Sequence, residues 1–346
     1  MAVSLKDVAQ VAGVSIKTVS NVVHDYPFVS AVTRARVQEA LAEMGYQPNL
    51  SARGLRSGQS GLIALSVPEV AVPYFGELAD RVVVAAEARG LTVLIDQTGG
   101  QRGHERRVAA GIRHNLVDGT IASPLAMTAE DIQSLGRRPL VLLGERLSHV
   151  AADHVAIDNV AAACSATAHL LSEGRHAIGA VGTSEEPLTG TGEQRLRGYH
   201  DALVAAGVPI DVHLEASVGW YHRADGYAAT RALLIRRPDL DALFCFNDLL
   251  AIGALRALRE AGRRVPDDVA VVGFDDIEEC LYTAPALSSV SPDKEAIAQT
   301  AIDLLIQRMG ATTAMEPQEV FPPYRLAVRA SSTTTASRSR TRRGYR

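Results

Sequence analysis

The chain has 346 residues, which is too long for one ordinary hydrophobic core. At roughly 150 residues per domain, two or three structural units are expected. Hydrophobic residues make up 47% and charged residues 21%, which is typical of a soluble globular protein and excludes a disordered or fibrous one. Three widely spaced cysteines exclude a secreted disulfide framework, and no signal peptide or membrane-spanning apolar stretch is visible. We therefore expect a cytoplasmic protein with no membrane partner.

The net charge of −4 hides an uneven distribution along the chain. Residues 1 to 60 carry +2, and residues 331 to 346 hold five arginines and no acid, which gives +5. Residues 61 to 330 therefore carry −11. A mildly acidic body with two cationic ends indicates that one or both ends contact a polyanion.

The first 48 residues show the pattern of three short helices and almost no strand signal. Apolar residues recur three and four apart from Leu5 to Ala12, as one face of a helix requires, and Gly13 then ends the pattern. Ser15 can cap a second helix, and Ser30 precedes a third helix that ends at Gly45. The expected inner faces are Val19, Val22 and Val23 on the second helix, and Val32, Val37, Ala40, Leu41 and Met44 on the third.

The spacing of three small residues in this region is typical of a helix-turn-helix. Ala9 lets the first two helices approach, Gly13 makes the turn, and Val19 fills the space between the helices. The spacing alone leaves a second interpretation open, a three-helix bundle that binds no nucleic acid.

A change of pattern separates this region from the rest of the chain. Pro48 breaks the helical pattern, and the flexible run Ser57-Gly58-Gln59-Ser60-Gly61 resembles a linker. Short apolar runs then alternate with longer amphipathic ones, which predicts parallel sheets covered by helices. Strands are expected at 62–67, 91–95, 120–123, 140–143, 177–182, 214–219, 242–246 and 269–274, and helices include 75–89, 160–173, 195–206, 225–236 and 249–261. So many units exceed one doubly wound sheet, and we expect two lobes.

Several motifs resemble the lactose-repressor family of bacterial transcription factors. In the first 60 residues they are KDVAQVAGVS, KTVSNVV, VSAVTRARV, GYQPN and ARGL. The resemblance continues to about residue 330 through PYF, DGTI, AIDN, RLRGY, FND and VVGFDD. It implies an α/β protein in which a small all-α helix-turn-helix domain precedes a two-lobed periplasmic-binding-protein-like (type I) domain.

The resemblance also implies domain boundaries. The DNA-binding domain is expected at 1–48 and a hinge helix with its linker at 49–60. The effector-binding and dimerisation domain is expected at 61–330. Its amino-terminal lobe would comprise about 61–158 and 290–320, and its carboxy-terminal lobe about 159–289 and 321–330. Residues 331–346 show no apolar periodicity and are expected to form a disordered, arginine-rich tail.

In that family the second helix lies in the major groove of DNA. The resemblance therefore places Ile16, Lys17, Ser20 and Asn21 at base edges, and Ser15 and Thr18 at phosphates. Lys17 could donate to guanine and Asn21 could bond adenine. The family more often has arginine at position 21, so the operator of a relative cannot be assumed here. A solvated helix face is the alternative for each residue.

The family's hinge helix corresponds to residues 49 to 56 and folds only on DNA. Leu55 takes the position of a leucine that each subunit inserts into the minor groove, where an apolar wedge bends the duplex. Gly54 costs a short helix about 1 kcal/mol relative to alanine, so the helix is expected to need DNA and its partner helix to form. Arg53 and Arg56 are the expected phosphate contacts. A purely structural leucine is the alternative.

The resemblance places a small-molecule site between the lobes, at the carboxyl ends of the strands. The residues carried over by motif are Tyr74, Phe75, Arg195, Asn247 and Asp275. An aromatic residue that stacks on a sugar falls at Tyr221 by family spacing, and a small loop shift would put Trp220 there instead. Alternatives remain open, since Arg195 could pair with an acid on its own lobe, Tyr74 and Phe75 could belong to the core, and Asp275 could be structural.

Catalytic and metal-binding motifs are not found in the sequence. It contains no G-x-S-x-G, H-E-x-x-H, Walker or G-x-G-x-x-G motif, and its ten histidines lack metal-site spacing. We therefore expect no catalytic residues, no metal and no cofactor.

Together these features predict a homodimeric transcriptional regulator that binds pseudo-palindromic operator DNA. The resemblance implies a repressor of carbohydrate-use genes, controlled by a sugar or sugar derivative. The tail contains no leucine, so it lacks the heptads by which tetramers of this family form, and a dimer is expected. The alternative function is a carbohydrate-binding sensor or transport protein that does not bind DNA.

Overall fold

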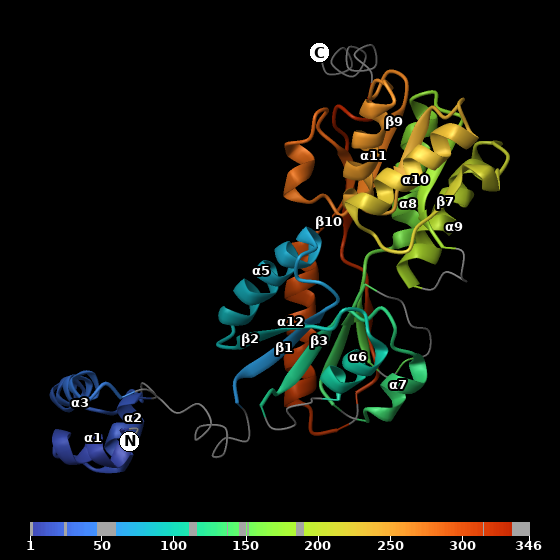
Figure 1. Ribbon diagram of the computed structural model, residues 1–346. Coiled ribbons are helices and arrows are strands. Elements are labelled where there is room, and N and C mark those ends of the chain that lie inside the picture. Colours follow the sequence, from blue (N-terminus) through green and yellow to red (C-terminus); the bar gives the residue numbers. More distant parts are fainter. Residues whose placement is uncertain are drawn as a thin grey trace, which may run out of the picture. The chain divides into compact units, whose positions relative to one another are not determined.

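The computed structural model describes residues 3–23, 26–46, 60–110, 116–136, 138–144, 150, 152–184, 190–313 and 315–333. The chain divides into two compact units, and the second begins at Leu62 (Figure 1). Each unit has its own hydrophobic core. The two units are therefore described separately.

The first unit contains three helices, at the positions that the sequence predicts. They are α1 (Leu5–Ala12), α2 (Ile16–Val23) and α3 (Ala31–Glu43). Their shared core consists of Val8, Ala9, Ala12, Val19, Val22, Val37 and Ala40. The expectation that Val32 faces this core is wrong, because the residue is 78% exposed in the first turn of α3. One turn further on, at Val37, the helix turns its apolar side to the core.

Side chains at the helix ends explain where these helices begin and end. Ser4 and Asp7 form a reciprocal capping box at the start of α1, in which the Asp7 carboxylate accepts the Ser4 amide hydrogen bond at 2.9 Å. Gly13 follows α1 with φ +62, in the left-handed region that favours glycine. Ser30 Oγ accepts a hydrogen bond from the Thr33 amide at the start of α3. The turn between α1 and α2 is therefore encoded by local sequence.

The second unit contains two lobes, each built on a six-stranded sheet. In the first lobe the strand order is β11-β5-β4-β3-β1-β2, and the neighbouring strands are parallel. The strands are β1 (Leu62–Val67), β2 (Thr92–Gln97), β3 (Gly119–Ala122), β4 (Leu140–Leu143), β5 (Asp153–Val155) and β11 (Glu319–Val320). The helices of this lobe are α5 (Pro73–Glu87), α6 (Arg102–Ala109), α7 (Ala129–Ser134) and α12 (Lys294–Gly310).

The sheet of the second lobe has the order β12-β10-β9-β8-β6-β7, with β12 antiparallel at its edge. The strands are β6 (Ile178–Thr183), β7 (Glu215–Ser217), β8 (Ala242–Cys245), β9 (Ala270–Phe274), β10 (Ser288–Pro292) and β12 (Tyr324–Ala327). The helices are α8 (Asn159–Ser172), α9 (Gly190–Ala205), α10 (Arg223–Arg236) and α11 (Asp248–Glu260), with short 3-10 turns η1 (Val212–Leu214) and η2 (Glu278–Leu281).

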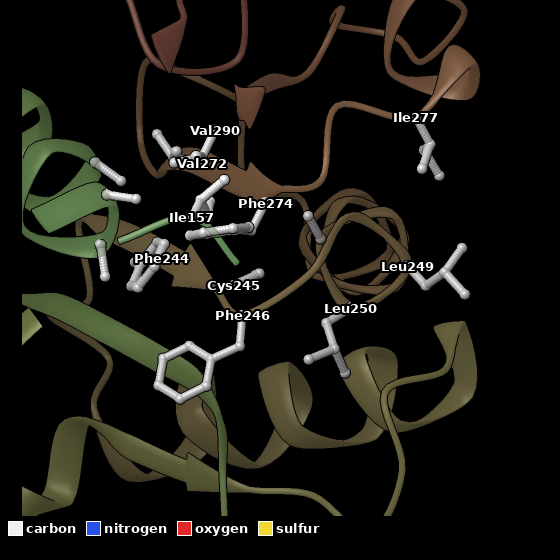
Figure 2. Close-up of a cluster of buried hydrophobic side chains, with 14 of the residues drawn as sticks. Ile157, Phe244, Cys245, Phe246, Leu249, Leu250, Val272, Phe274, Ile277 and Val290 are labelled. Atoms are coloured by element: carbon white, nitrogen blue, oxygen red, sulfur yellow. The ribbon is translucent and has the colours of Figure 1, made fainter. Parts of the chain in front are cut away.

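The core of the second lobe extends to the carboxyl ends of its central strands. Phe244, Phe246 and Phe274 are fully buried there, and Leu250 of α11 packs into the same cluster (Figure 2). Buried aromatic residues hold the ends of β8 and β9 rigidly, because close-packed interiors leave side chains little freedom. The packing therefore fixes the positions of the polar residues that follow these strands.

The chain crosses between the lobes three times: from β5 to α8, from β10 to α12, and from β11 to β12. The lobe boundary expected near residue 290 falls inside β10, which continues to Pro292 within the second sheet. β10 contains the buried serines Ser288 and Ser289, and this polar strand has no apolar alternation that would reveal its end.

The expected disordered tail from residue 331 is also wrong at its start. Ser331 and Ser332 are fully buried in the second lobe. Ser331 Oγ accepts a hydrogen bond from the Ser288 amide at 2.8 Å, and Ser332 Oγ bonds Ser288 Oγ at 2.7 Å. Burial of hydroxyls is stable here because each is hydrogen-bonded. Residues 334 to 346 lie outside the described residues.

Candidate functional site

One face of α2 in the first unit is exposed and the other is packed. Val19 and Val22 are buried, whereas Ile16 is 49% exposed and Lys17 is also exposed. Ser20 and Asn21 are half-buried, one turn further along. A helix of this kind presents its amino-terminal turn and one flank, which is the part of a recognition helix that contacts base edges.

The side chains of Ser15 and Thr18 form hydrogen bonds with each other's residue at the start of α2. Ser15 Oγ accepts a hydrogen bond from the Thr18 amide at 3.1 Å and lies 2.9 Å from the Thr18 hydroxyl. Their expected contact with phosphate therefore stays a prediction. The expected hinge contacts Arg53, Leu55 and Arg56 lie outside the described residues.

A cavity of about 350 Å³ lies between the two lobes of the second unit. Its lining includes residues that follow β1, β3, β4 and β5 of the first sheet by one or two positions, and residues that follow β7, β8 and β9 of the second in the same way. Parallel sheets place ligand sites at these carboxyl ends, and roughly 300–1,000 Å³ is the usual size for small-molecule pockets. All seven residues expected from the sequence line this cavity: Tyr74, Phe75, Arg195, Trp220, Tyr221, Asn247 and Asp275.

Arg195 projects from α9 and is held on several sides. Its Nε donates to Asn159 Oδ1 at 3.0 Å, its Nη1 donates to the Phe246 carbonyl, and its Nη2 lies 3.7 Å from Asp275 Oδ1. The guanidinium carbon lies 3.5 Å from the centre of the Phe274 ring. Arg195 thus pairs with an acid of its own lobe and also lines the cavity. The structural interpretation of this residue and the ligand-site interpretation are therefore compatible.

Asp275 follows β9 with φ +105, a conformation that a non-glycine residue seldom adopts. Burial raises the pKa of its carboxyl to about 6, while the charges of Arg195 and Lys294 act to lower it. Strained backbone at a cavity wall is a recurring property of ligand sites. The carboxylate is well placed to accept hydrogen bonds from a ligand.

Asn247 lies two residues after β8 and caps α11. Its Oδ1 accepts a hydrogen bond from the Leu250 amide at 2.9 Å, and its Nδ2 donates to the Tyr221 carbonyl at 3.0 Å. Asn247 therefore fixes the loop that carries the two adjacent aromatic residues at the cavity.

The aromatic residues of the cavity differ in how firmly they are held. The Tyr221 hydroxyl donates to the Gly182 carbonyl at 2.8 Å, and its ring contacts Phe246 edge-on. Trp220 is 50% exposed, and its ring lies parallel to that of His222 with centroids 5.9 Å apart. Tyr74 is packed against Phe75, and burial raises the pKa of its phenol. Trp220 consequently offers the most accessible aromatic face.

Known proteins with matching sequences settle the family. Residues 4–49 match the family described as bacterial regulatory proteins, lacI family, and residues 167–332 match a periplasmic binding protein-like domain. The HTH-type transcriptional regulator CelR of Thermobifida fusca is 34% identical over 342 residues, which cover 95% of this chain and 98% of CelR. The chain belongs to the LacI family. It is a DNA-binding transcriptional regulator.

Solved structures agree with this assignment. A complex of the regulator CelR with cellobiose is 32% identical, with a TM-score of 0.71 and coverage of 95% of this chain and 99% of that one. A lac repressor dimer bound to operator and an anti-inducer is 26% identical, with a TM-score of 0.84 and coverage of 96% and 100%. The expected family, fold and regulatory function of this LacI-family chain are thus confirmed.

Glu69 and His222 are among the cavity residues of this LacI-family regulator that sequence reasoning missed. A signal for Glu69 was available, because this acidic residue comes two positions after the buried strand β1. His222 had no such signal, since its partner Glu69 lies 153 residues away.

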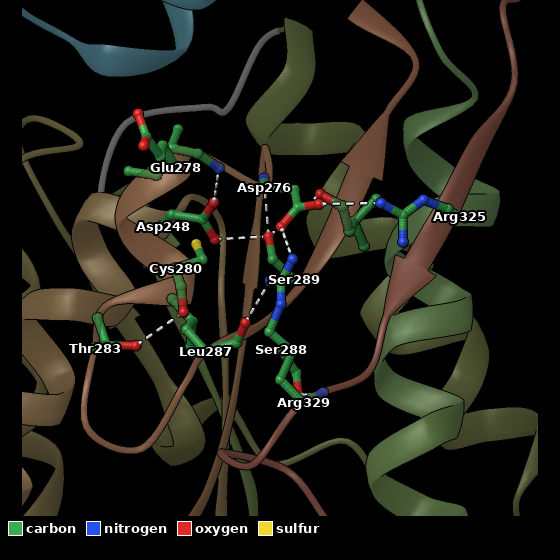
Figure 3. A network of polar contacts seen from close by, with 12 residues as sticks. Asp248, Asp276, Glu278, Cys280, Thr283, Leu287, Ser288, Ser289, Arg325 and Arg329 are labelled. Atoms are coloured by element: carbon green, nitrogen blue, oxygen red, sulfur yellow. Dashed lines mark hydrogen bonds and ion pairs between the residues drawn. The ribbon is translucent and has the colours of Figure 1, made fainter.

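A network of polar contacts surrounds Asp248 and Asp276, the residue after Asp275 (Figure 3). Asp248 accepts hydrogen bonds from Ser289 Oγ at 2.7 Å and from the Ile277 amide at 3.0 Å. Asp276, with φ +48, pairs with Arg329 at 2.7 Å. Burial raises the pKa of Asp248 to about 8, and the Asp275 charge adds to the shift. The network therefore orders the loop that carries Asp275 and Asp276, and Asp248 is a second buried acid in this part of the lobe.

The described residues contain no group of three or more histidine, cysteine or acidic side chains that could hold a metal ion. Within the same part of the chain, no helix is long and apolar enough to cross a membrane.

Proposed function

We propose that this LacI-family regulator represses carbohydrate-use genes and is controlled by an uncharged sugar bound between its lobes. The observation that carries the proposal is the cavity itself, which is lined by Arg195, Asn247 and Asp275 and also by the exposed residue Trp220. Sugar hydroxyls need partners that donate and accept in fixed directions, and an aromatic ring packs on the apolar face of a sugar.

The charges that line the cavity favour a neutral ligand. Glu69 and Asp275 contribute acidic groups, and the guanidinium of Arg195 is already bonded to Asn159, to the Phe246 carbonyl and to Asp275. Among the described residues that line the cavity, a sugar phosphate would meet two carboxylates, and the guanidinium of Arg195 already has partners. An unphosphorylated sugar avoids this repulsion. The CelR–cellobiose complex supports a ligand of the same class.

The exposed flank of α2 supports operator recognition, with a homodimer presenting two such helices to a pseudo-palindrome. The operator-bound lac repressor dimer supports this arrangement. Ligand binding would favour one arrangement of the lobes and thereby change the affinity for DNA. Sedimentation of the purified protein is expected to show a dimer, and a monomer or tetramer would contradict this part of the proposal.

A thermal-shift screen with neutral sugars and their phosphates tests the ligand class, because a ligand stabilises the folded state to which it binds. We expect a neutral sugar to raise the melting temperature and to change the affinity for operator selected from random DNA. The variant Asp275→Ala should bind operator but lose the response to the sugar. Asp201→Asn changes an exposed acid on α9 and serves as the control. Stabilisation by sugar phosphates alone would overturn the neutral-ligand assignment.

A further inference from the structure

A side-chain contact joins the lobes at the cavity. Glu69 lies in the loop between β1 and α5 of the first lobe, and His222 lies at the start of α10 in the second. Glu69 Oε2 and His222 Nε2 are 3.0 Å apart. The two residues line the cavity, and their side chains are 27% and 42% exposed. This pair therefore stands between the cavity and solvent.

Two other polar contacts also bridge the lobes. Glu77 of α5 accepts a hydrogen bond from the Glu278 amide at 2.8 Å, and Lys294 of α12 donates to the Asp276 carbonyl at 2.9 Å. Lys294 belongs to the segment that directly follows the β10–α12 crossing, and it also binds Glu77 at 2.7 Å. Both contacts therefore lie next to a segment of chain that already connects the two lobes. Glu69 and His222 are far along the chain from all three crossings, so their contact joins two segments that no neighbouring crossing connects.

The His222 ring has a defined position on its own lobe. Its backbone amide donates to Asp225 Oδ2 at 3.3 Å, and its Nδ1 lies 3.9 Å from the same carboxylate. One ring edge thus faces Asp225 and the other faces Glu69. The flat face of the ring is covered by Trp220 at an interplanar angle of 4°. His222 consequently links a carboxylate of the first lobe to the exposed aromatic ring of the second.

We propose that Glu69 and His222 form a latch that holds the lobes closed over the ligand and positions Trp220 against it. The proposal deepens the proposed function and rests on it for the ligand. Glu69 acts as a positioning residue, since it reaches Trp220 only through His222. Loss of one charged hydrogen bond is expected to speed ligand dissociation about tenfold. Slower release would follow from the latch because the ligand leaves only when the lobes part.

The chain offers a direct probe of the latch, because Trp220 is its single tryptophan. Its fluorescence and its quenching by acrylamide report the stacked state without any ligand. In Glu69→Ala we expect stronger quenching and emission at longer wavelength than in the wild-type protein. Glu69→Gln keeps a hydrogen-bond acceptor and should restore much of the wild-type quenching. Glu87→Ala, an exposed glutamate of α5, is the matched control.

Release of sugar from each variant is then followed by stopped-flow Trp220 fluorescence, with cellobiose tested first and the other neutral sugars of the screen after it. Unchanged quenching in Glu69→Ala overturns the latch, whether or not a sugar binds. Changed quenching with unchanged release overturns its part in ligand retention. If no sugar binds the wild-type protein, the proposed function fails and the quenching result still decides whether the contact positions Trp220. Equal melting temperatures of the variants exclude general unfolding.

Discussion

The carboxylate of Asp248 fills the space beside Gly273. A Cβ atom at position 273 would overlap Asp248 Oδ1 and would lie only 3.3 Å from the Ala251 side chain. The same Oδ1 accepts the Ser289 hydrogen bond, while Oδ2 accepts that of the Ile277 amide. Glycine at 273 thus allows a buried acid to stand behind the loop that carries Asp275.

Replacement of this glycine is expected to destabilise the second lobe. Gly273→Ala forces Asp248 or the strand β9 to shift, and overpacking of a buried site costs about 1–3 kcal/mol. Urea denaturation measures the loss. Gly103→Ala is the control, because a Cβ there meets nothing within 4 Å on helix α6. Equal free energies of unfolding for the two variants would show that Asp248 moves away from the added methyl group without destabilising the protein.

The two raised carboxyl pKa values predict a pH dependence of stability. Asp248 titrates at about 8 and Asp275 at about 6 in the folded protein, against 3.8 for an ordinary aspartate. The folded state therefore binds more protons than the unfolded state between pH 4 and 8, as these pKa values imply. The free energy of unfolding should accordingly fall as pH rises through this window. The decrease is on the order of a few kcal/mol.

The variant Asp248→Asn isolates this effect, since it keeps the shape of the side chain and removes its ionisation. We expect a shallower decrease of stability between pH 5 and 8 than in the wild-type protein, as urea denaturation at each pH would show. The comparison is needed because burial lowers the pKa of His169, which acts in the opposite direction. Parallel curves for the two proteins would refute an ionisable, strongly shifted Asp248.

The exposed flank of α2 predicts which substitutions weaken operator binding. Lys17→Ala should cost about 1–3 kcal/mol of specific affinity if the lysine contacts a base. Asn21→Ala should relax specificity at one base pair in the same range. Lys6→Ala removes an equal charge from the exposed side of α1 and serves as the control. Gel-shift titration at fixed salt measures the affinity of each variant for operator and for other DNA. If Lys17→Ala lowers the affinity equally for all DNA sequences, Lys17 contacts phosphate and not a base.

Leu55 provides a separate prediction, which comes from the sequence resemblance alone. If it inserts into the minor groove, Leu55→Ala should abolish specific operator binding and leave sugar affinity intact. Gel-shift and calorimetric titrations of one preparation measure both properties. Operator binding equal to that of the wild-type protein would remove Leu55 from the interface.

Much of the cavity could be assigned from sequence because its residues stand in motifs that resemble those of the LacI family. Asn247 and Asp275 stand directly after the apolar runs of β8 and β9, where a polar residue marks a strand end. The choice between Tyr221 and Trp220 could not be made in this way. Only the packing shows that the Tyr221 hydroxyl is bonded to Gly182 and that Trp220 remains accessible.

The length indicated several units, and local spacing determined the short helices and the turn between the first two, because Ala9, Gly13 and Val19 act within a few residues of one another. The alternation of apolar runs likewise determined the parallel sheets. Tertiary structure alone decided the contact of Glu69 with His222, 153 residues away, and the burial of Ser331 in the second lobe. Such contacts join polar residues from distant segments, and polar side chains acquire a burial pattern only when the folded chain supplies their hydrogen-bond partners.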